Sequence, residues 1–219
     1  MKLSVIIPVY NEASTLALLL GRVLAVPVEK EVVVVDDGSG EETKRLLQTA
    51  VSNGDVQLIT HPQNRGKGAA ICTALEQVGG DVVIIQDADL EYFPEDYLAL
   101  LAAYRQNQTQ AVYGVRNLEE RSRLMRWGNQ TMTMVTNVLY GCKLHDMETC
   151  YKLIDRKLMQ DLQLSSRGFE IEAEITAKLL RRGINIVEAP IQYEHRKEGK
   201  KLTPWDGLPT VKTLVRYRW

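Results

Sequence analysis

Hydrophobic and polar positions follow two different periods along the first half of the chain. Short apolar runs, the mark of buried strands, occur at residues 3–7, 32–35, 56–60 and 82–85. Apolar residues at helical spacing lie between these runs, at Leu16, Leu19, Leu20, Val23 and Leu24, then at Leu46, Leu47 and Ala50, and then at Ile71, Ala74, Leu75 and Val78. The run 32–35 is entirely valine, which is typical of a parallel strand covered on both faces. This half therefore predicts repeated strand–helix units.

The second half is less regular. Its pattern predicts helices over residues 97–104 and 121–140, strands at 111–115 and 184–187, and a helix from Ile171 through Leu179 that Gly183 ends. No linker, repeat or low-complexity segment interrupts the chain, so we expect one domain over residues 1–219. The fold class predicted is α/β, a mostly parallel, Rossmann-like sheet with helices on both faces.

In such sheets ligands bind beyond the carboxyl ends of the strands. Three polar clusters fall at predicted strand ends, at residues 10–12, 36–39 and 87–89. Asp87 and Asp89 stand one residue apart after the apolar run 82–85, so both can reach one divalent cation, with Glu91 close enough to assist. Carboxylate oxygens favour Mg²⁺ or Mn²⁺ over zinc. For the tripeptide alone, a solvated acidic turn is an equal alternative.

Two further segments are candidates for ligand contact. Asp37 follows the valine strand and suits ribose hydroxyls or base N–H groups, whereas Ser39 with Glu42 predicts a capping box on the next helix. Gly66 and Gly68 precede a predicted helix, where backbone N–H groups can approach an anion. A flexible helix start explains these glycines equally well. His61, His145 and His195 share no motif and are expected in surface or loop positions.

Composition adds limits on partners and location. Of 219 residues, 45% are hydrophobic and 25% charged, the balance of a soluble globular protein, and the net charge of −1 predicts no nucleic-acid partner. Residues 195–219 nevertheless form a basic segment. Three cysteines without a paired motif favour a reducing compartment, and neither a signal peptide nor a spanning helix is recognisable. We expect a cytoplasmic protein, or one peripheral to the cytoplasmic face of a membrane, and oligomerisation stays open.

The order of the motifs resembles glycosyltransferase family 2, and within it the dolichol-phosphate mannosyltransferases and related polyprenyl-phosphate glycosyltransferases. The segments that carry the resemblance are Val-Ile-Ile-Pro-Val-Tyr-Asn-Glu at 5–12, Val-Val-Asp-Asp-Gly-Ser at 34–39, Asn-Arg-Gly-Lys-Gly at 64–68, Gln-Asp-Ala-Asp-Leu at 86–90, Gly-Val-Arg at 114–116 and Asp-Met-Glu-Thr-Cys-Tyr-Lys at 146–152. Glu-Ala-Pro-Ile at 188–191 and a basic loop after it resemble the end of that branch's domain.

The resemblance implies a GT-A fold, inversion at the anomeric carbon, and a set of site residues. Donor binding would fall to Pro8, Tyr10, Glu12, Val35, Asp37, Asp87, Ala88, Asp89, Arg116, Arg196 and Lys201. Asp87, Asp89 and Glu91 would hold the metal, Thr149 and Lys152 would face the acceptor, and Asp89, Arg116 and Asp146 would be catalytic. Lys152 stands where the branch tends to have arginine, which weakens bidentate phosphate recognition. A nucleotide-sugar half of about 1–115 would precede an acceptor half of about 116–219.

The expected activity is transfer of a hexose from a nucleotide diphosphate-sugar, of the GDP-mannose or UDP-glucose type, to polyprenyl or dolichyl phosphate. A lipid phosphate is already an anion and needs no base, whereas a glycan or small-molecule hydroxyl needs one, for which Asp146 is the candidate. Alternatives are such a hydroxyl acceptor and a non-catalytic nucleotide-sugar-binding scaffold. A nucleotidyltransferase is disfavoured, because no glycine-rich loop follows the first strand.

Two segments are candidates for contact with lipid. Met132, Met134, Val135, Val138 and Leu139 form an apolar surface on the predicted helix 121–140. Residues 209–219 predict a short amphipathic helix whose apolar side carries Leu208, Val211, Leu214 and Val215, beside Lys212, Arg216 and Arg218. Core packing or a subunit contact is the alternative for both.

Overall fold

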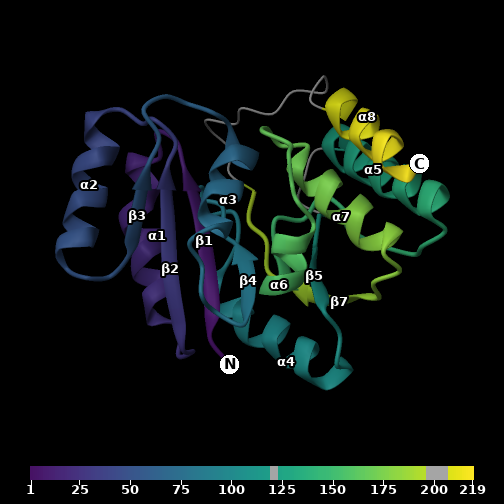
Figure 1. Cartoon of the computed structure of the whole chain (residues 1–219), viewed down its shortest axis with the longest axis horizontal. Helices are drawn as coiled ribbons and strands as arrows, with labels where there is room; N and C mark the ends of the chain where they lie inside the picture. The colour runs from purple at the N-terminus through teal and green to yellow at the C-terminus, as the bar shows by residue number, and fades with distance from the viewer. Residues whose placement is uncertain (119–122, 196–206) are drawn as a thin grey trace.

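A seven-stranded sheet runs through the part of the chain that the computed structural model describes, residues 1–118, 123–195 and 207–219 (Figure 1). Its strands are β1 (Leu3–Val9), β2 (Lys30–Asp36), β3 (Gln57–Thr60), β4 (Val82–Ile85), β5 (Ala111–Arg116), β6 (Lys152–Asp155) and β7 (Ile186–Ile191). Their order across the sheet is β3-β2-β1-β4-β6-β5-β7. The chain thus starts in the middle of the sheet, builds one edge, and returns to build the other.

Most neighbouring strands are parallel, as the sequence predicts. β1 pairs in parallel with β2 and β4, β2 with β3, and β5 with β7. β6 is the exception, antiparallel to both β4 and β5. Because parallel strands end at the same edge, the loops that follow β1, β2 and β4 gather there.

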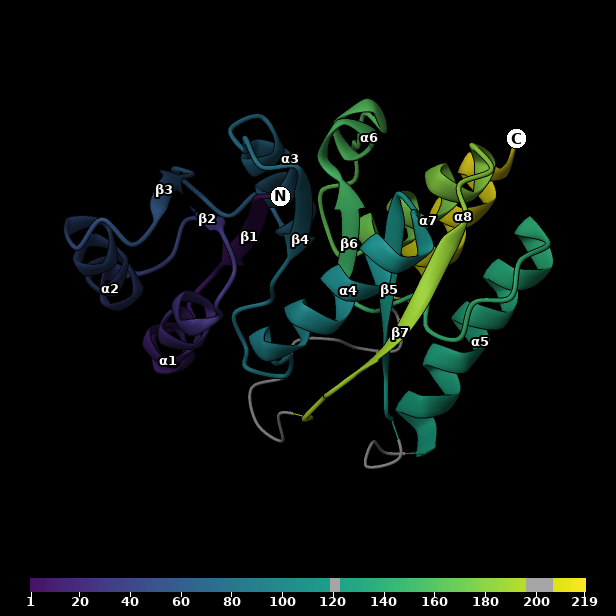
Figure 2. The ribbon, with the colours of Figure 1, turned by 90° about the horizontal axis from the view of Figure 1, so that it is seen from below.

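Helices cover both faces of the sheet, which confirms the predicted α/β class. The helices are α1 (Ala13–Ala25), α2 (Glu41–Ser52), α3 (Lys67–Leu75), α4 (Tyr97–Asn107), α5 (Arg123–Tyr140), α6 (Arg156–Asp161), α7 (Ile171–Arg181) and α8 (Gly207–Arg218), with a 3₁₀ turn η1 (Pro94–Asp96). Seen along the strands, α1, α2 and α4 lie on one side and α3, α6 and α7 on the other (Figure 2). The main core packs between them and includes the fully buried valines of β2.

Two elements of the structure were missed, and one sequence prediction is wrong. β6 and α6 were not anticipated, because β6 has four residues and starts at the charged Lys152. The capping box of Ser39 and Glu42 is wrong. The α2 helix begins at Glu41 with Gly40 as its N-cap and has no side-chain cap, because Ser39 Oγ accepts a bond from the Asn11 amide instead, at 3.0 Å.

A second, smaller apolar cluster joins α5, α7 and α8. Met147, Ala173, Ala177 and Leu214 form its buried part, and Met132, Val135 and Leu139 of α5 pack against it. These α5 residues are therefore packed within the molecule, whereas Met134 and Val138 are 61% and 78% exposed. Three of the five apolar residues predicted as a surface on this helix thus serve internal packing. Among the described residues, no helix is long and apolar enough to cross a membrane.

Candidate active site

The loops after β1, β2 and β4 are held together by hydrogen bonds at one edge of the sheet. Asn11 Oδ1 accepts from the Gly40 amide at 2.8 Å, which joins the loop after β1 to that after β2. Thr15 Oγ1 donates to the Ala88 carbonyl at 2.6 Å, which joins α1 to the segment after β4. The three polar clusters expected at strand ends therefore share one site.

Asp37 organises the loop that leads to the glycine motif. Its Oδ1 accepts from the Arg65 amide at 2.9 Å and its Oδ2 from the Gly66 amide at 2.8 Å. His61 Nδ1 lies 2.7 Å from Asp37 Oδ1, and its Nε2 lies 3.0 Å from Thr73 Oγ1. His61 follows β3 as expected of a loop residue, but its side chain is buried rather than exposed, because it braces Asp37. Sequence reasoning missed this role.

Gly66 and Gly68 are required by a close backbone approach. Gly66 has φ +98°, and a Cβ there would lie 2.3 Å from the Arg167 carbonyl oxygen. A Cβ on Gly68 would lie 2.3 Å from the Ser166 carbonyl oxygen. The Ala69 amide donates to the Arg167 carbonyl at 3.2 Å, so this N–H is already satisfied. These glycines thus admit a neighbouring loop, which neither sequence interpretation anticipated.

Asp87 and Asp89 lie just after β4, separated from it by Gln86, as predicted. Asp89 Oδ1 accepts from the Glu91 amide at 3.1 Å. Leu90, between Asp89 and Glu91, has φ +64°. This left-handed conformation is unusual for a bulky residue and turns the chain sharply. Burial, together with the charges of Asp87 and Glu91, raises the pKa of Asp89 to about 7. Ionisation of Asp89 beside Asp87 and Glu91 is therefore costly, and a bound cation would offset that cost.

Glu91 is engaged by the residues that follow β7. The Tyr193 hydroxyl donates to Glu91 Oε2, and His195 Nδ1 lies 3.2 Å from Glu91 Oε1. Within the described ranges, no three His, Cys, Asp or Glu side chains are arranged to hold an ion by themselves. A cation at Asp87 and Asp89 would need further oxygens from its ligand, and diphosphate oxygens supply them. The donor set fits Mg²⁺ or Mn²⁺ on those terms.

Beneath this turn lies a buried polar support that the sequence did not reveal. Gln86 is 0% exposed, and its Oε1 accepts from the hydroxyls of Tyr97 and Tyr151 at 2.5 and 2.6 Å. Its Nε2 donates to the Asp87 carbonyl at 2.9 Å. The backbone of Asp87 is therefore fixed from below.

Arg116 and Asp146 form a buried, two-pronged ion pair. Arg116 Nε donates to Asp146 Oδ2 at 2.7 Å and Nη2 to Oδ1 at 2.8 Å, and Nη2 also donates to Asn129 Oδ1 at 2.8 Å. The guanidinium lies over the Tyr193 ring, 5.3 Å from its centroid. Burial by itself raises the pKa of Asp146, but the charge and hydrogen bonds of Arg116 outweigh it and hold that pKa below its ordinary value. Asp146 is thus a weak base.

Thr149 and Lys152, expected at the acceptor side, are both buried. Lys152 Nζ lies 2.7 Å from Glu172 Oε2 and donates to the Thr149 carbonyl. Thr149 Oγ1 has no hydrogen-bond partner among the described residues. An acceptor phosphate could meet Lys152 only after displacing Glu172, so this geometry argues against direct contact.

The predicted nucleoside-pocket residues come from β1, β2 and α1. Pro8 pairs with Val35 across the two strands, and the Val35 side chain is 0% exposed in the core, so it could meet a ligand only through its main chain. Ala88 is also buried, whereas Tyr10 is 38% exposed and Glu12 stands at the N-cap of α1. Arg196 and Lys201 lie outside the described residues.

This fold and site define an α/β protein with a cluster of acidic side chains at the carboxyl ends of its central strands. The family model for glycosyl transferase family 2 matches residues 4–163. The chain belongs to that family.

Relatives and solved structures agree with this assignment. Polyprenol monophosphomannose synthase of Mycolicibacterium smegmatis is 29% identical over 210 residues, which cover 89% of this chain and 78% of that protein. Undecaprenyl-phosphate 4-deoxy-4-formamido-L-arabinose transferase of Pseudomonas fluorescens is 32% identical over 202 residues, 90% of this chain but 58% of that protein. The chain therefore spans little more than half of that second relative.

Glucosyl-3-phosphoglycerate synthase of M. tuberculosis has the same fold. Its structure superposes with a TM-score of 0.75 at 19% identity, covering 99% of this chain and 80% of that one. A complex of that enzyme with Mn²⁺, UDP-glucose and phosphoglyceric acid superposes with a TM-score of 0.74. The GT-A fold expected from the sequence is confirmed.

Proposed function

We propose that this glycosyltransferase moves a hexose from a nucleotide diphosphate-sugar to a polyprenyl phosphate, with Mg²⁺ or Mn²⁺ bound by Asp87 and Asp89. The observation that carries the choice of acceptor is the Arg116–Asp146 pair. A hydroxyl acceptor needs a base, and Asp146 is held as an ionised partner of Arg116 with a lowered pKa. A phosphate acceptor is already an anion, so it needs none. The names of the two relatives support the same choice.

The metal would neutralise the charge that develops on the departing nucleoside diphosphate. Asp87 and Asp89 offer the oxygen ligands, and Gln86 holds the backbone of Asp87 in place. Glu91 is the third proposed ligand, although it also receives the Tyr193 hydroxyl. Asp37 would act indirectly: its carboxylate holds the backbone of the loop at Arg65, which would lie beside the nucleoside.

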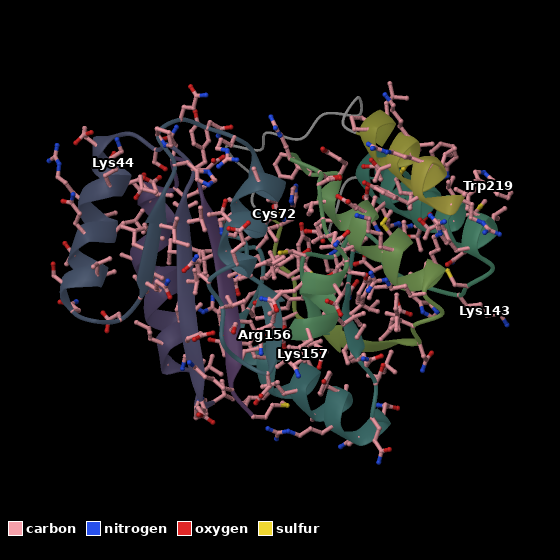
Figure 3. All side chains as sticks on the ribbon, viewed as in Figure 1. Lys44, Cys72, Lys143, Arg156, Lys157 and Trp219 are labelled. Atoms are coloured by element: carbon pink, nitrogen blue, oxygen red, sulfur yellow. The ribbon has the colours of Figure 1, made fainter. Side chains whose placement is uncertain are left out.

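A peripheral membrane contact fits the two helices at one end of the molecule. Exposed apolar side chains lie on α5, on α8 and at the residue that follows α8. We call them the outer apolar residues, and they are Trp127, Met134, Val138, Leu208, Val215 and Trp219. The helices are joined, since the Tyr140 hydroxyl donates to the Leu214 carbonyl at 2.8 Å. Figure 3 places Lys143 at the same end as Trp219, where cations suit anionic headgroups.

A donor–acceptor matrix tests this proposal. UDP- and GDP-sugars are supplied with and without a short polyprenyl phosphate or a soluble hydroxyl acceptor, and transfer and hydrolysis are measured separately. We expect metal-dependent transfer to polyprenyl phosphate. Efficient transfer to the hydroxyl acceptor with none to polyprenyl phosphate would contradict the lipid assignment and restore Asp146 as a candidate base. Binding of nucleotide-sugars without transfer would favour the scaffold alternative.

A further inference from the structure

A lysine ammonium lies where the predicted cation would bind. Lys67, the first residue of α3, places Nζ 2.7 Å from Asp87 Oδ1 and 3.0 Å from Asp87 Oδ2. The same nitrogen lies 3.1 Å from Glu172 Oε1, at the start of α7. Its side chain is 11% exposed. Both oxygens of Asp87 are therefore engaged by one internal cation.

Glu172 is fixed from its other side. Its Oε2 accepts from Lys152 Nζ at 2.7 Å, and the Lys152 side chain is 0% exposed. The four side chains Asp87, Lys67, Glu172 and Lys152 therefore alternate in charge from the site into the core. Because Lys152 is itself held by the Thr149 carbonyl, Glu172 anchors Lys67 whether or not Asp87 is available.

We propose that Lys67 is the resident counter-ion of Asp87, and that an incoming divalent cation displaces it and so couples metal binding to anion binding. This rests on the proposed metal role of Asp87. A cation bound at Asp87 needs an oxygen that Lys67 now occupies, and it repels the ammonium. Lys67 then keeps Glu172 and has protons to donate to an anion beside the metal, such as a nucleoside diphosphate.

The displaced lysine stays charged. Its Nζ keeps the Glu172 carboxylate, at 3.1 Å, but Glu172 is already paired with Lys152 at 2.7 Å. Lys67 therefore yields Asp87 by moving, and its charge must be met by another anion. Metal alone must compete with Lys67 for Asp87, whereas a diphosphate bound with the metal gives the displaced lysine a new partner. Metal and diphosphate therefore bind with positive cooperativity, that is, with a favourable coupling free energy.

Calorimetric titration of Mn²⁺ tests this, because binding is measured without turnover. Wild type and Lys67→Met are titrated with Mn²⁺ alone and with saturating GDP or UDP. We expect Lys67→Met to bind Mn²⁺ alone about tenfold more tightly, in the usual range of a site coupling. The factor by which the nucleotide raises Mn²⁺ affinity should fall several-fold in the variant, because the diphosphate can no longer accept hydrogen bonds from Lys67.

Lys44→Met is the matched control, since it removes one positive charge from an exposed pair with Glu41 at 3.4 Å. Its Mn²⁺ affinity should equal that of wild type. Should Lys67→Met not fold, Lys67→Gln removes the charge but retains a polar, hydrogen-bonding side chain, and it should show the same tightening.

Three results would overturn the inference. An Mn²⁺ affinity in the Lys67 variants equal to wild type shows that the lysine does not compete. Equal tightening in Lys44→Met reduces the effect to net charge. Wild type that binds no Mn²⁺ even with nucleotide removes the metal role of Asp87 itself, a failure of the proposed function that the transfer assay would show separately.

Discussion

Arg116 and Asp146 illustrate how a single buried pair decides between two chemistries. Because the pair is nearly excluded from solvent, the charge of each partner offsets the free-energy cost of burying the other. Asp146→Asn leaves the Arg116 guanidinium without its counter-charge, so we expect the free energy of unfolding to fall by about 3–5 kcal/mol. Urea denaturation measures this. Asp161→Asn, at an exposed position, should change it by less than about 0.5 kcal/mol.

The same variant also separates a structural role from a catalytic one. If Asp146 only positions Arg116, the residual transfer activity of Asp146→Asn keeps the wild-type shape of its pH–rate profile. Loss of the acidic limb of that profile would identify Asp146 as the base and contradict the phosphate-acceptor proposal.

Asp89 belongs to the proposed pair of metal ligands, so its removal should lower both nucleotide-sugar binding and turnover. We expect Asp89→Ala to lower transfer by at least about 10²-fold, as loss of one stabilising contact to developing charge does elsewhere. Nucleotide-sugar affinity in the presence of Mn²⁺ should fall as well, because the diphosphate loses its bridge to the protein. Titration with Mn²⁺ present measures this, and full wild-type activity in excess chelator would sink the metal assignment.

At this scale the sequence located the acids at strand ends but not their partners. Asp87 and Asp89 could be placed because an apolar run ends immediately before them. Lys67 was visible in a glycine motif, yet nothing near it pointed to Glu172, which lies about a hundred residues further along the chain. A buried charge pair joins distant segments, and local patterns do not encode such pairings.

Among the elements, the start of α3 and the loop before α7 form the tightest backbone contact at the site. Gly68→Ala would set a methyl group 2.3 Å from the Ser166 carbonyl oxygen, so we expect destabilisation of about 1–3 kcal/mol as the two segments separate. Gly21→Ala is the matched control. It lies inside α1 with nothing within 4 Å, so it should stabilise the protein by about 0.5–1 kcal/mol. Thermal unfolding of both variants measures the difference, and equal effects would contradict the close-approach explanation.

Glu174 of α7 holds the same loop and makes its stability depend on pH. Its carboxylate accepts from the amides of Ser165 and Ser166 and pairs with Lys178 at 2.6 Å. Burial opposes the charge, but these contacts lower the pKa of Glu174 to about 2, below its value in an unfolded chain. The stabilisation is therefore complete above the ordinary carboxyl pKa and is lost as the pH falls towards about 2.

Glu174→Gln should remove part of that dependence. We expect the free energy of unfolding of the variant to vary less than that of wild type between about pH 4.5 and 2. Denaturant titrations across this window measure it. Glu31, whose pKa is also lowered to about 2, keeps a residual slope of the same sign. Identical slopes in variant and wild type would contradict the role of Glu174.

Elements with a clear period were predicted from sequence, and those held by tertiary contacts were not. The bounds of β4 were predicted correctly because a strand covered on both faces of a sheet consists of consecutive apolar residues, as Val82–Ile85 does. β6 was missed because its pairing with both β4 and β5 is antiparallel and non-local, and its first residue is a buried lysine. The capping box failed because Ser39 bonds across the site instead of along its own helix.

On the scale of the whole molecule, the outer apolar residues give the proposed membrane contact a testable surface. Val138→Glu puts a charge on the exposed side of α5, so we expect co-sedimentation with anionic liposomes at low salt to fall clearly below that of wild type. Leu18→Glu is the matched control, since Leu18 is 60% exposed on α1, far along the chain and outside this surface. Equal binding by both variants, or no binding by wild type, would contradict the contact.

The antiparallel strand β6 also determines when the central sheet can be completed during synthesis. When β1 to β4 have left the ribosome, β4 can pair with β1 on one side, but residues 152–155, which pair with its other side, have not yet been made. Until then the chain presents the open edge of Val82–Ile85, whose side chains are fully apolar and later fully buried. The two halves that the sequence suggested, before and after about residue 115, are thus interleaved by one returning strand. A nascent chain stopped short of β6 would carry an unprotected hydrophobic edge, a form that chaperones bind and that aggregates when they do not.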